Sequence, residues 1–189
     1  MVKVVIVNGM PGCGKTTFET KCDEICYCGN NLGFSTNRPL YIKTISTVDR
    51  VKQIARNCGW DGEKNLKNRK FLSDLKTLLV EWDDIPCRDA EQWARDLSTG
   101  EADWILFVDC REPAEIQKLK ERLNATTVLI RRDSVEYDEV SNHADSDVFY
   151  YDYDLTIYNN SDIIHLEDAA RKFIEYMKKE EVPHYVNVD

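Results

Sequence analysis

The densest chemical signal in the sequence lies near its beginning, where small residues precede a lysine and a pair of threonines. Residues 9–16 read Gly-Met-Pro-Gly-Cys-Gly-Lys-Thr and match the spacing G-x-x-x-x-G-K-[ST]. Glycines there let successive backbone N–H groups turn inward around a phosphate, and the positive end of the following helix adds attraction. The sequence therefore predicts a phosphate-binding loop for a nucleotide, formed by Gly9, Pro11, Gly12, Cys13, Gly14, Lys15, Thr16 and Thr17.

Within this loop, Lys15 and Thr16 have different expected roles. The lysine ammonium reaches the β- and γ-phosphates of a nucleotide, and the hydroxyl that follows it ligates Mg²⁺. The metal needs an acidic ligand as well, and Asp109 directly follows the apolar run at residues 105–108. We expect Thr16 and Asp109 to hold Mg²⁺, with ATP as the nucleotide. The alternative for Asp109 is a strand-end turn or helix cap, because Pro113 opens the next helix.

Phosphoryl transfer also needs cations outside the loop to balance the charge of the migrating group. Arg111 follows Asp109 closely, at the carboxyl end of a strand, where open α/β sheets bind ligands. Arg131 and Arg132 follow another apolar run and begin a long polar segment, residues 131–154, which is predicted to be a lid. We expect the catalytic residues to be Lys15, Asp109, Arg111, Arg131 and Arg132. Surface ion pairs with neighbouring acidic residues are the alternative for the arginines.

A basic stretch within an acidic chain indicates the charge of the second substrate. The formal net charge is −9, yet residues 46–82 are rich in cations, including Arg50, Lys52, Arg56, Lys64, Lys67, Arg69 and Lys70. We expect this segment to bind an anionic acceptor, although a solvated helix face would look similar. Trp60 and Tyr41 could stack on a base, with a turn anchored by the indole as the alternative. His143, inside the predicted lid, is expected to order that segment rather than to act as a base.

The elements that must position these side chains follow from short apolar runs rich in β-branched residues. The clearest runs are residues 4–7, 104–108 and 126–130, with weaker ones at 40–44 and 155–158. Helices are predicted at residues 16–25, 49–57, 65–82, 89–97, 114–123 and 163–179. This alternation predicts a three-layer α/β/α sandwich with about five parallel strands, in which strands 4–7 and 104–108 can lie side by side.

Two apolar stripes at helical spacing are interpreted as core rather than as cofactor contacts. The first lies in the helix predicted at residues 65–82 and the second in the last helix. Their members are Leu72, Leu75, Leu79 and Trp82, and Leu166, Ala170, Phe173 and Met177.

Length and composition restrict the class of protein. The 189 residues fit one domain, residues 1–189, and a hydrophobic content of 42% is enough to form a core. The net negative charge argues against nucleic-acid partners and anionic membranes, and no apolar run is long enough to span a bilayer. The seven cysteines lack a repeated C-x-x-C spacing, so we expect reduced thiols and a cytoplasmic location. An oxidisable Cys13 is the alternative to a small filler in the loop.

Several short motifs, taken in order, resemble the P-loop nucleoside monophosphate kinase superfamily. The similarity is strongest to the branch that includes phage-type deoxynucleoside monophosphate kinases and animal-type phosphomevalonate kinases, and it extends to small bacterial P-loop proteins without an assigned activity. The motifs are Gly9–Thr16, Gly59–Lys64, Arg69–Leu75, Val108–Arg111 with Glu115-Ile116, Asn142–Ala144, and Tyr151–Asp154 leading to Asn159-Asn160. They span nearly the whole chain, and the first is the most specific.

The resemblance implies a kinase core with acceptor-binding and lid parts, Mg-ATP as donor and a small phosphorylated acceptor. A (deoxy)nucleoside monophosphate is the leading acceptor. The sequence lacks a clear D-G-[FY]-P-R signature, so the acceptor's identity stays open. The alternatives are a small-metabolite kinase with a phosphomevalonate-like acceptor and a nucleotide-binding regulatory P-loop protein that transfers nothing.

Overall fold

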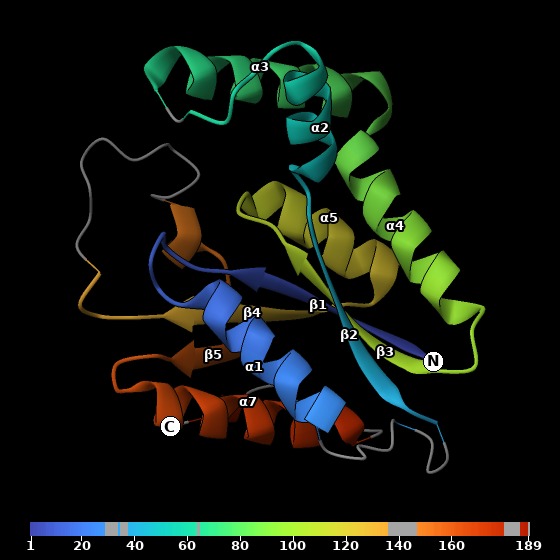
Figure 1. The fold of residues 1–189 in the computed structure, drawn as a ribbon, viewed down its shortest axis with the longest axis vertical. Coiled ribbons are helices and arrows are strands. Elements are labelled where there is room, and N and C mark those ends of the chain that lie inside the picture. Colours follow the sequence, from blue (N-terminus) through green and yellow to red (C-terminus); the bar gives the residue numbers. More distant parts are fainter. Residues whose placement is uncertain (29–33, 35–37, 64, 136–146, 180–185, 189) are drawn as a thin grey trace.

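The computed structural model describes residues 1–28, 34, 38–63, 65–135, 147–179 and 186–188. These form one sheet in the order β2-β3-β1-β4-β5-β6, in which every neighbouring pair is parallel (Figure 1). The predicted α/β/α architecture is confirmed, with β6 added at one edge. The strands are β1 Val2–Asn8, β2 Leu40–Ser46, β3 Asp103–Asp109, β4 Thr126–Arg131, β5 Leu155–Tyr158 and β6 Val186–Val188.

Helices begin and end close to the positions that the sequence predicts. Asn65 caps α3 by accepting the Asn68 backbone N–H, and Asp162 caps α7 in the same way. Prolines lie in the first turns of α4 and α5, where a missing N–H costs little. The helices are α1 Lys15–Cys28, α2 Asp49–Asn57, α3 Leu66–Asp83, α4 Ile85–Ser98, α5 Pro113–Leu123 and α7 Ile163–Lys178, with a 3₁₀ turn η1 at Asp147–Tyr150.

The helices cover both faces of the sheet. α1 packs with α7 on one face, and α4 packs with α5 on the other (Figure 1). β1 lies between β3 and β4 and is buried over most of its length, as its continuous Val-Val-Ile-Val run predicts. The connection after β1 therefore leaves toward one face and the connection after β3 toward the other.

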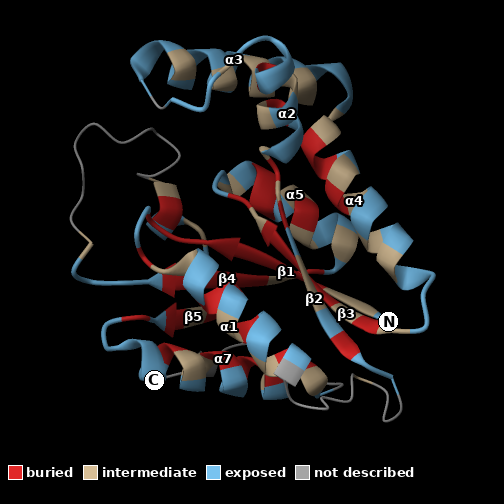
Figure 2. Cartoon of the chain, viewed as in Figure 1, coloured by how far each residue is buried: buried red, intermediate tan, exposed pale blue. Residues whose placement is uncertain are grey.

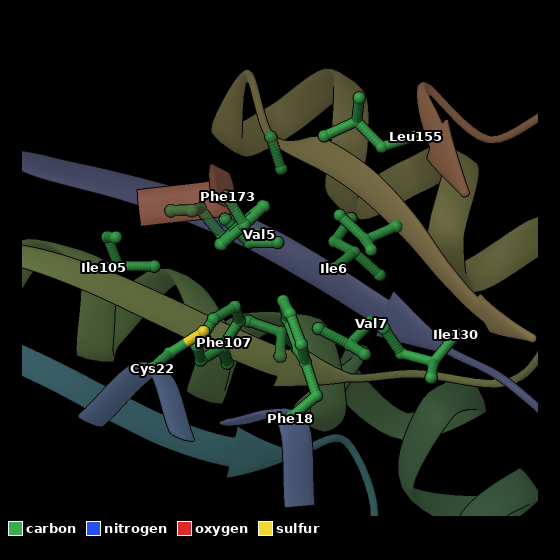
Figure 3. Close-up of a cluster of buried hydrophobic side chains, with 14 of the residues drawn as sticks. Val5, Ile6, Val7, Phe18, Cys22, Ile105, Phe107, Ile130, Leu155 and Phe173 are labelled. Atoms are coloured by element: carbon green, nitrogen blue, oxygen red, sulfur yellow. The ribbon is translucent and has the colours of Figure 1, made fainter. Parts of the chain in front are cut away.

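Aromatic side chains fill the layer between α1, α7 and the sheet. Phe18 of α1 packs edge-on against Phe173 of α7, with ring centroids 5.4 Å apart, and against Phe107 of β3 at 6.3 Å. Cys22, one turn after Phe18, is fully buried beside the same strand (Figure 3). The inward face of α1 is thereby fixed against β3, which sets the direction in which the helix leaves the loop before it.

The two predicted core stripes have different outcomes. All four stripe residues of α7 are buried, as expected. In α3 the stripe prediction is wrong: none of its residues is buried, and Trp82 is 82% exposed (Figure 2). α3 packs against α2 and α4 rather than against the sheet, so its apolar side chains are only partly covered.

No helix in the part of the chain that the structure describes combines the length and the apolar character needed to cross a bilayer.

Candidate functional site

The predicted site residues from the first and third strands lie at one edge of the sheet. β1 and β3 pair in parallel with Val7 opposite Asp109, so Asp109 emerges beside the start of the glycine-rich loop. The chain leaves β1 and β3 toward opposite faces at the carboxyl edge of the sheet, with α1 on one face and α5 on the other. This edge is the place where open α/β sheets bind ligands.

At two positions the loop after β1 approaches neighbouring atoms too closely for any residue but glycine. A Cβ on Gly9, whose φ is +153°, would lie 2.4 Å from the Ile130 carbonyl oxygen. A Cβ on Gly14, at φ +101°, would lie 2.4 Å from the Asn159 side-chain nitrogen. These positive φ angles and close approaches explain why glycine occurs at both ends of the loop.

Two buried asparagines hold the loop in shape. The Asn8 side-chain oxygen accepts the Gly9 N–H at 2.8 Å. Its side-chain nitrogen donates to the Tyr153 hydroxyl at 2.7 Å and to the Arg111 carbonyl oxygen at 3.2 Å. Asn159, at the end of β5, donates to the Cys13 carbonyl oxygen at 2.8 Å. The loop is thus tied to β3, to β5 and to the segment that precedes β5.

Lys15 is the first residue of α1 and turns back over the loop. Its ammonium donates to the carbonyl oxygens of Gly9, at 2.6 Å, and Met10, at 3.3 Å. Thr16 and Thr17 are exposed in the first turn of α1. The loop therefore has next to it the N-terminus of α1, the Lys15 ammonium and two exposed hydroxyls, which are groups suited to an anion.

Asp109 lies against a second carboxyl group that the sequence interpretation did not include. Glu19 of α1 is 5% exposed, and its carboxyl group is within hydrogen-bonding reach of that of Asp109. Burial, together with the neighbouring Asp109, raises the pKa of Glu19 to about 8. Burial also raises the pKa of Asp109, against the opposing effects of Lys15 and Arg111. One oxygen of each carboxyl group, Oε1 of Glu19 and Oδ1 of Asp109, is buried without a hydrogen-bond partner among the described residues.

These unpaired oxygens bear on the two interpretations of Asp109. A strand-end turn or a helix cap would give its side chain a backbone N–H to accept. Instead its buried Oδ1 is unpaired, and only its backbone carbonyl takes part in the turn, accepting the Thr47 N–H at 3.1 Å. Carboxylate oxygens without donors are suited to a hard cation, so this edge fits the Mg²⁺ site that the sequence predicts.

The predicted arginines divide into two groups. Arg111 lies two residues after Asp109, and its positive charge opposes the rise in the pKa of that carboxyl group. Arg131 pairs with Asp133 at 2.9 Å and lies over the rings of Phe149 and Tyr158 at 5.5 and 5.9 Å. Arg132 is exposed on the loop after β4. The structure thus brings Lys15, Asp109 and Arg111 together. Arg131 instead contacts side chains near the ends of β4 and β5.

Cys13 is the least exposed side chain of the loop's variable positions, at 1%. Burial raises the pKa of its thiol, and the nearby Lys15 only partly opposes this. A raised pKa works against thiolate formation, so the structure favours the filler interpretation over the redox one. Cys22 and Cys26 are also buried free thiols, in line with inward packing.

The expected acceptor segment begins at the carboxyl edge of the sheet, where Ser46 pairs with Asp109. At least two of its cations are engaged in ion pairs. Arg50 forms two hydrogen bonds with Asp89 of α4, and Lys70 pairs with Asp74 on the exposed side of α3. The Trp60 indole donates to the Glu63 carbonyl oxygen within its own turn. Tyr41, near the start of β2, lies at the amino-terminal edge of the sheet, away from the loop, and its ring packs on that of Trp104 with centroids 5.2 Å apart.

The expected lid is described only in part, because His143 and residues 136–146 lie outside the described residues, as does Lys64 of the basic segment. After this gap the chain enters the core: Val148 is fully buried, and the buried Tyr153 donates to the Val148 carbonyl oxygen at 2.8 Å. Tyr153 in turn accepts from Asn8. The carboxyl-terminal end of this segment is therefore joined directly to the residue that precedes the loop.

The sequence interpretation missed Glu19, Asn8 and Lys76. A signal for Glu19 exists, since it lies one turn after Lys15 and next to Phe18, on the face of α1 that packs inward. Asn8 ends an otherwise apolar strand, where a buried amide needs partners. Lys76 reaches from α3 to Glu112 and to the buried Glu115, both at 2.9 Å. That contact joins the acceptor segment to the start of α5.

No protein-family model matches the chain. A search of curated proteins likewise finds no match. The parallel sheet with helices on both faces is compatible with a P-loop NTPase-like fold.

Proposed function

We propose that the protein is an ATP-dependent phosphotransferase that moves the γ-phosphate of Mg-ATP to a small phosphorylated acceptor. The observation that carries the proposal is the loop between β1 and α1. Gly9 and Gly14 are required there by close approach, and the Lys15 ammonium and the N-terminus of α1 lie next to the loop. The half-buried carboxyl group of Asp109 lies beside it with an unpaired oxygen. Phosphate binding and cation binding are thereby supported at the same edge of the sheet.

Each residue at this edge has a role in such a transfer. The loop N–H groups and Lys15 would hold the β- and γ-phosphates, which requires Lys15 to exchange its bonds to Gly9 and Met10 for phosphate oxygens. Arg111 supplies positive charge where the phosphoryl group would migrate. Thr16 and Asp109 would hold Mg²⁺, which neutralises charge on the donor phosphates when it is bound. An anionic acceptor needs no strong base, so the site requires no histidine.

A nucleoside monophosphate is the leading acceptor. The basic residues 46–82 reach the same edge, and Lys76 ties that segment to the start of α5. An anionic group on the acceptor fits this local charge. A phosphorylated small metabolite would use the same donor site with a different pocket.

A panel of acceptors tests the proposal directly. Purified protein is incubated with Mg²⁺, radiolabelled ATP and, one at a time, the nucleoside monophosphates and phosphorylated isoprenoid precursors, and products are identified by mass. Lys15→Ala should lower transfer by about a hundredfold or more, because a charge held against the transferring phosphate is lost. Lys21→Ala is the matched control, since Lys21 lies on the same helix but pairs with Glu24.

Three results would contradict the proposal. Wild-type protein that binds no ATP removes the donor site altogether. Slow hydrolysis of ATP that no acceptor stimulates favours a nucleotide-binding regulatory protein. Transfer that Lys15→Ala leaves unchanged places the chemistry elsewhere.

A further inference from the structure

Two neighbouring carboxyl groups, those of the buried Glu19 and the half-buried Asp109, lie beside the predicted phosphate-binding loop. Asp109 is the last residue of β3, and Glu19 lies in the second turn of α1. The pair therefore connects β3 with α1. Packing of Phe18 and Cys22 against β3 holds this face of α1 toward the sheet (Figure 3). Glu19 cannot turn to solvent without α1 leaving that core.

The charges of Lys15 and Arg111 oppose the rise in the pKa of Asp109, and the charge of Lys15 does the same for Glu19. No ion pair, however, joins Glu19 or Asp109 to a basic side chain among the described residues, and the ammonium of Lys15 is bonded to the Gly9 and Met10 carbonyl oxygens. Glu19 is 5% exposed, and its Oε1 has no donor within the described part of the chain. Two carboxyl groups at such a distance cannot both be ionised without repelling one another, so the pair must share either a proton or a bound cation. A cation would also give the unpaired buried oxygens a partner.

We propose that Glu19 is a second carboxylate ligand for a divalent cation at Asp109, so that the metal site spans α1 and β3. The inference rests on the proposed function for its place beside a donor phosphate, but it concerns metal binding by the protein itself. Mg²⁺ is commonly held by one or two carboxylates, and oxygen donors select hard cations such as Mg²⁺ and Mn²⁺. Thr16 lies on the same helix face as Glu19, at i and i+3, which adds a hydroxyl to the two carboxylates.

The test measures Mn²⁺ binding to the full chain without nucleotide, by electron paramagnetic resonance of free Mn²⁺. Glu19→Gln should weaken Mn²⁺ binding by about tenfold or more, in the range seen when groups around metal sites are removed. Asp109→Asn should weaken it at least as strongly. Glu24→Gln removes the same charge from the exposed side of the same helix, where Glu24 pairs with Lys21, and should leave Mn²⁺ binding unchanged.

The choice of glutamine separates a ligand from a positioning residue. Its amide can still donate a hydrogen bond to Asp109, so a residue that only orients Asp109 would keep Mn²⁺ affinity in Glu19→Gln, and the proposal would be overturned. Binding of metal-free ATP, measured with a chelator, should be unchanged in that variant and shows that the loop is intact. Wild-type protein that binds no Mn²⁺ also overturns the proposal. Tight, Glu19-dependent Mn²⁺ binding without transfer to any acceptor would instead support it while removing the phosphotransferase.

Discussion

The side-chain amide of Asn159 donates a hydrogen bond of 2.8 Å to the backbone carbonyl of Cys13, from 146 residues further along the chain. Asn159 is 8% exposed and its backbone N–H is also fixed, bonded to the Arg131 carbonyl oxygen at 2.7 Å. The end of β5 therefore acts as a support for the glycine-rich loop after β1. A residue far from the loop in sequence helps to set the direction of the loop's N–H groups.

Asn159→Ala should accordingly weaken nucleotide binding. It leaves the buried Cys13 carbonyl without its donor, a loss of about 1–3 kcal/mol, and it frees the loop to reorient. We expect ATP affinity to fall by about five- to tenfold, measured by calorimetric titration. Asn160→Ala is the control, because Asn160 pairs with Asp133 on the surface and does not touch the loop. Equal losses in the two variants would show that Asn159 does not support the loop.

Substitution of the loop glycines by alanine should destabilise the protein in a definite order. At Gly9 the new Cβ meets a backbone oxygen that cannot move away, whereas at Gly14 it meets a side-chain nitrogen. At Gly12 nothing lies within 4 Å, so only the positive φ of 79° is strained, at about 1 kcal/mol. Urea unfolding should therefore rank the losses Gly9→Ala, then Gly14→Ala, then Gly12→Ala. A larger loss for Gly12→Ala than for Gly9→Ala would contradict the loop geometry.

Lys76 and Lys70 offer a matched pair on α3. Lys76→Met removes the cation from Glu115, which is only 8% exposed and also accepts from Thr47, and an uncompensated buried charge costs about 3–5 kcal/mol. We expect about half of that loss, because Glu115 keeps the Thr47 hydroxyl and the Cys110 thiol as donors. Lys70→Met breaks the exposed pair with Asp74 and should change the free energy of unfolding by about 0.5 kcal/mol or less. Chemical denaturation measures both, and similar values would mean that the Lys76 contact is not formed.

Asp154 should make the protein sensitive to acid. Burial raises the pKa of Asp154, but hydrogen bonds from Lys120 and from the N–H and hydroxyl of Thr127 outweigh burial and lower it. The stabilisation is therefore complete above the ordinary carboxyl pKa and is lost as pH falls through the lower folded value. Asp154→Asn should cost about 1–3 kcal/mol at pH 7, and its difference from wild type should shrink toward pH 3. A difference that stays constant over this range in urea titrations would show that Asp154 does not titrate in this way.

The central strands β1 and β3 could be predicted because they are buried over most of their length. The apolar runs at residues 4–7 and 104–108 lie within β1 and β3, with Asp109 at the end of the latter, since a central parallel strand has no room for polar residues. The α3 stripe could not be judged in the same way. Helical periodicity indicates an apolar face but not the element that covers it, and Trp82 points to solvent.

Within the site, residues that are adjacent in the sequence could be predicted, whereas residues that only the fold brings next to the loop could not. Lys15, Thr16 and the glycines are adjacent, so their spacing suffices. Glu19 gives no motif, because a single glutamate in a helix is normally at the surface, and only the packing of Phe18 turns it inward. The contact between Asn159 and Cys13 depends on the pairing of β4 with β5, which no short pattern encodes.

The contrast in burial between β1 and α3 has a consequence for how the molecule opens. Residues Val4–Asn8 of β1 are buried between two neighbouring strands, so their amides should exchange with deuterium only when the whole domain unfolds. α3 has no buried residue, and its amides should exchange through a local opening of much smaller free energy. The glycine-rich loop is thus attached to the strand whose amides we expect to exchange slowest, whereas α3 is expected to open locally at a smaller free energy.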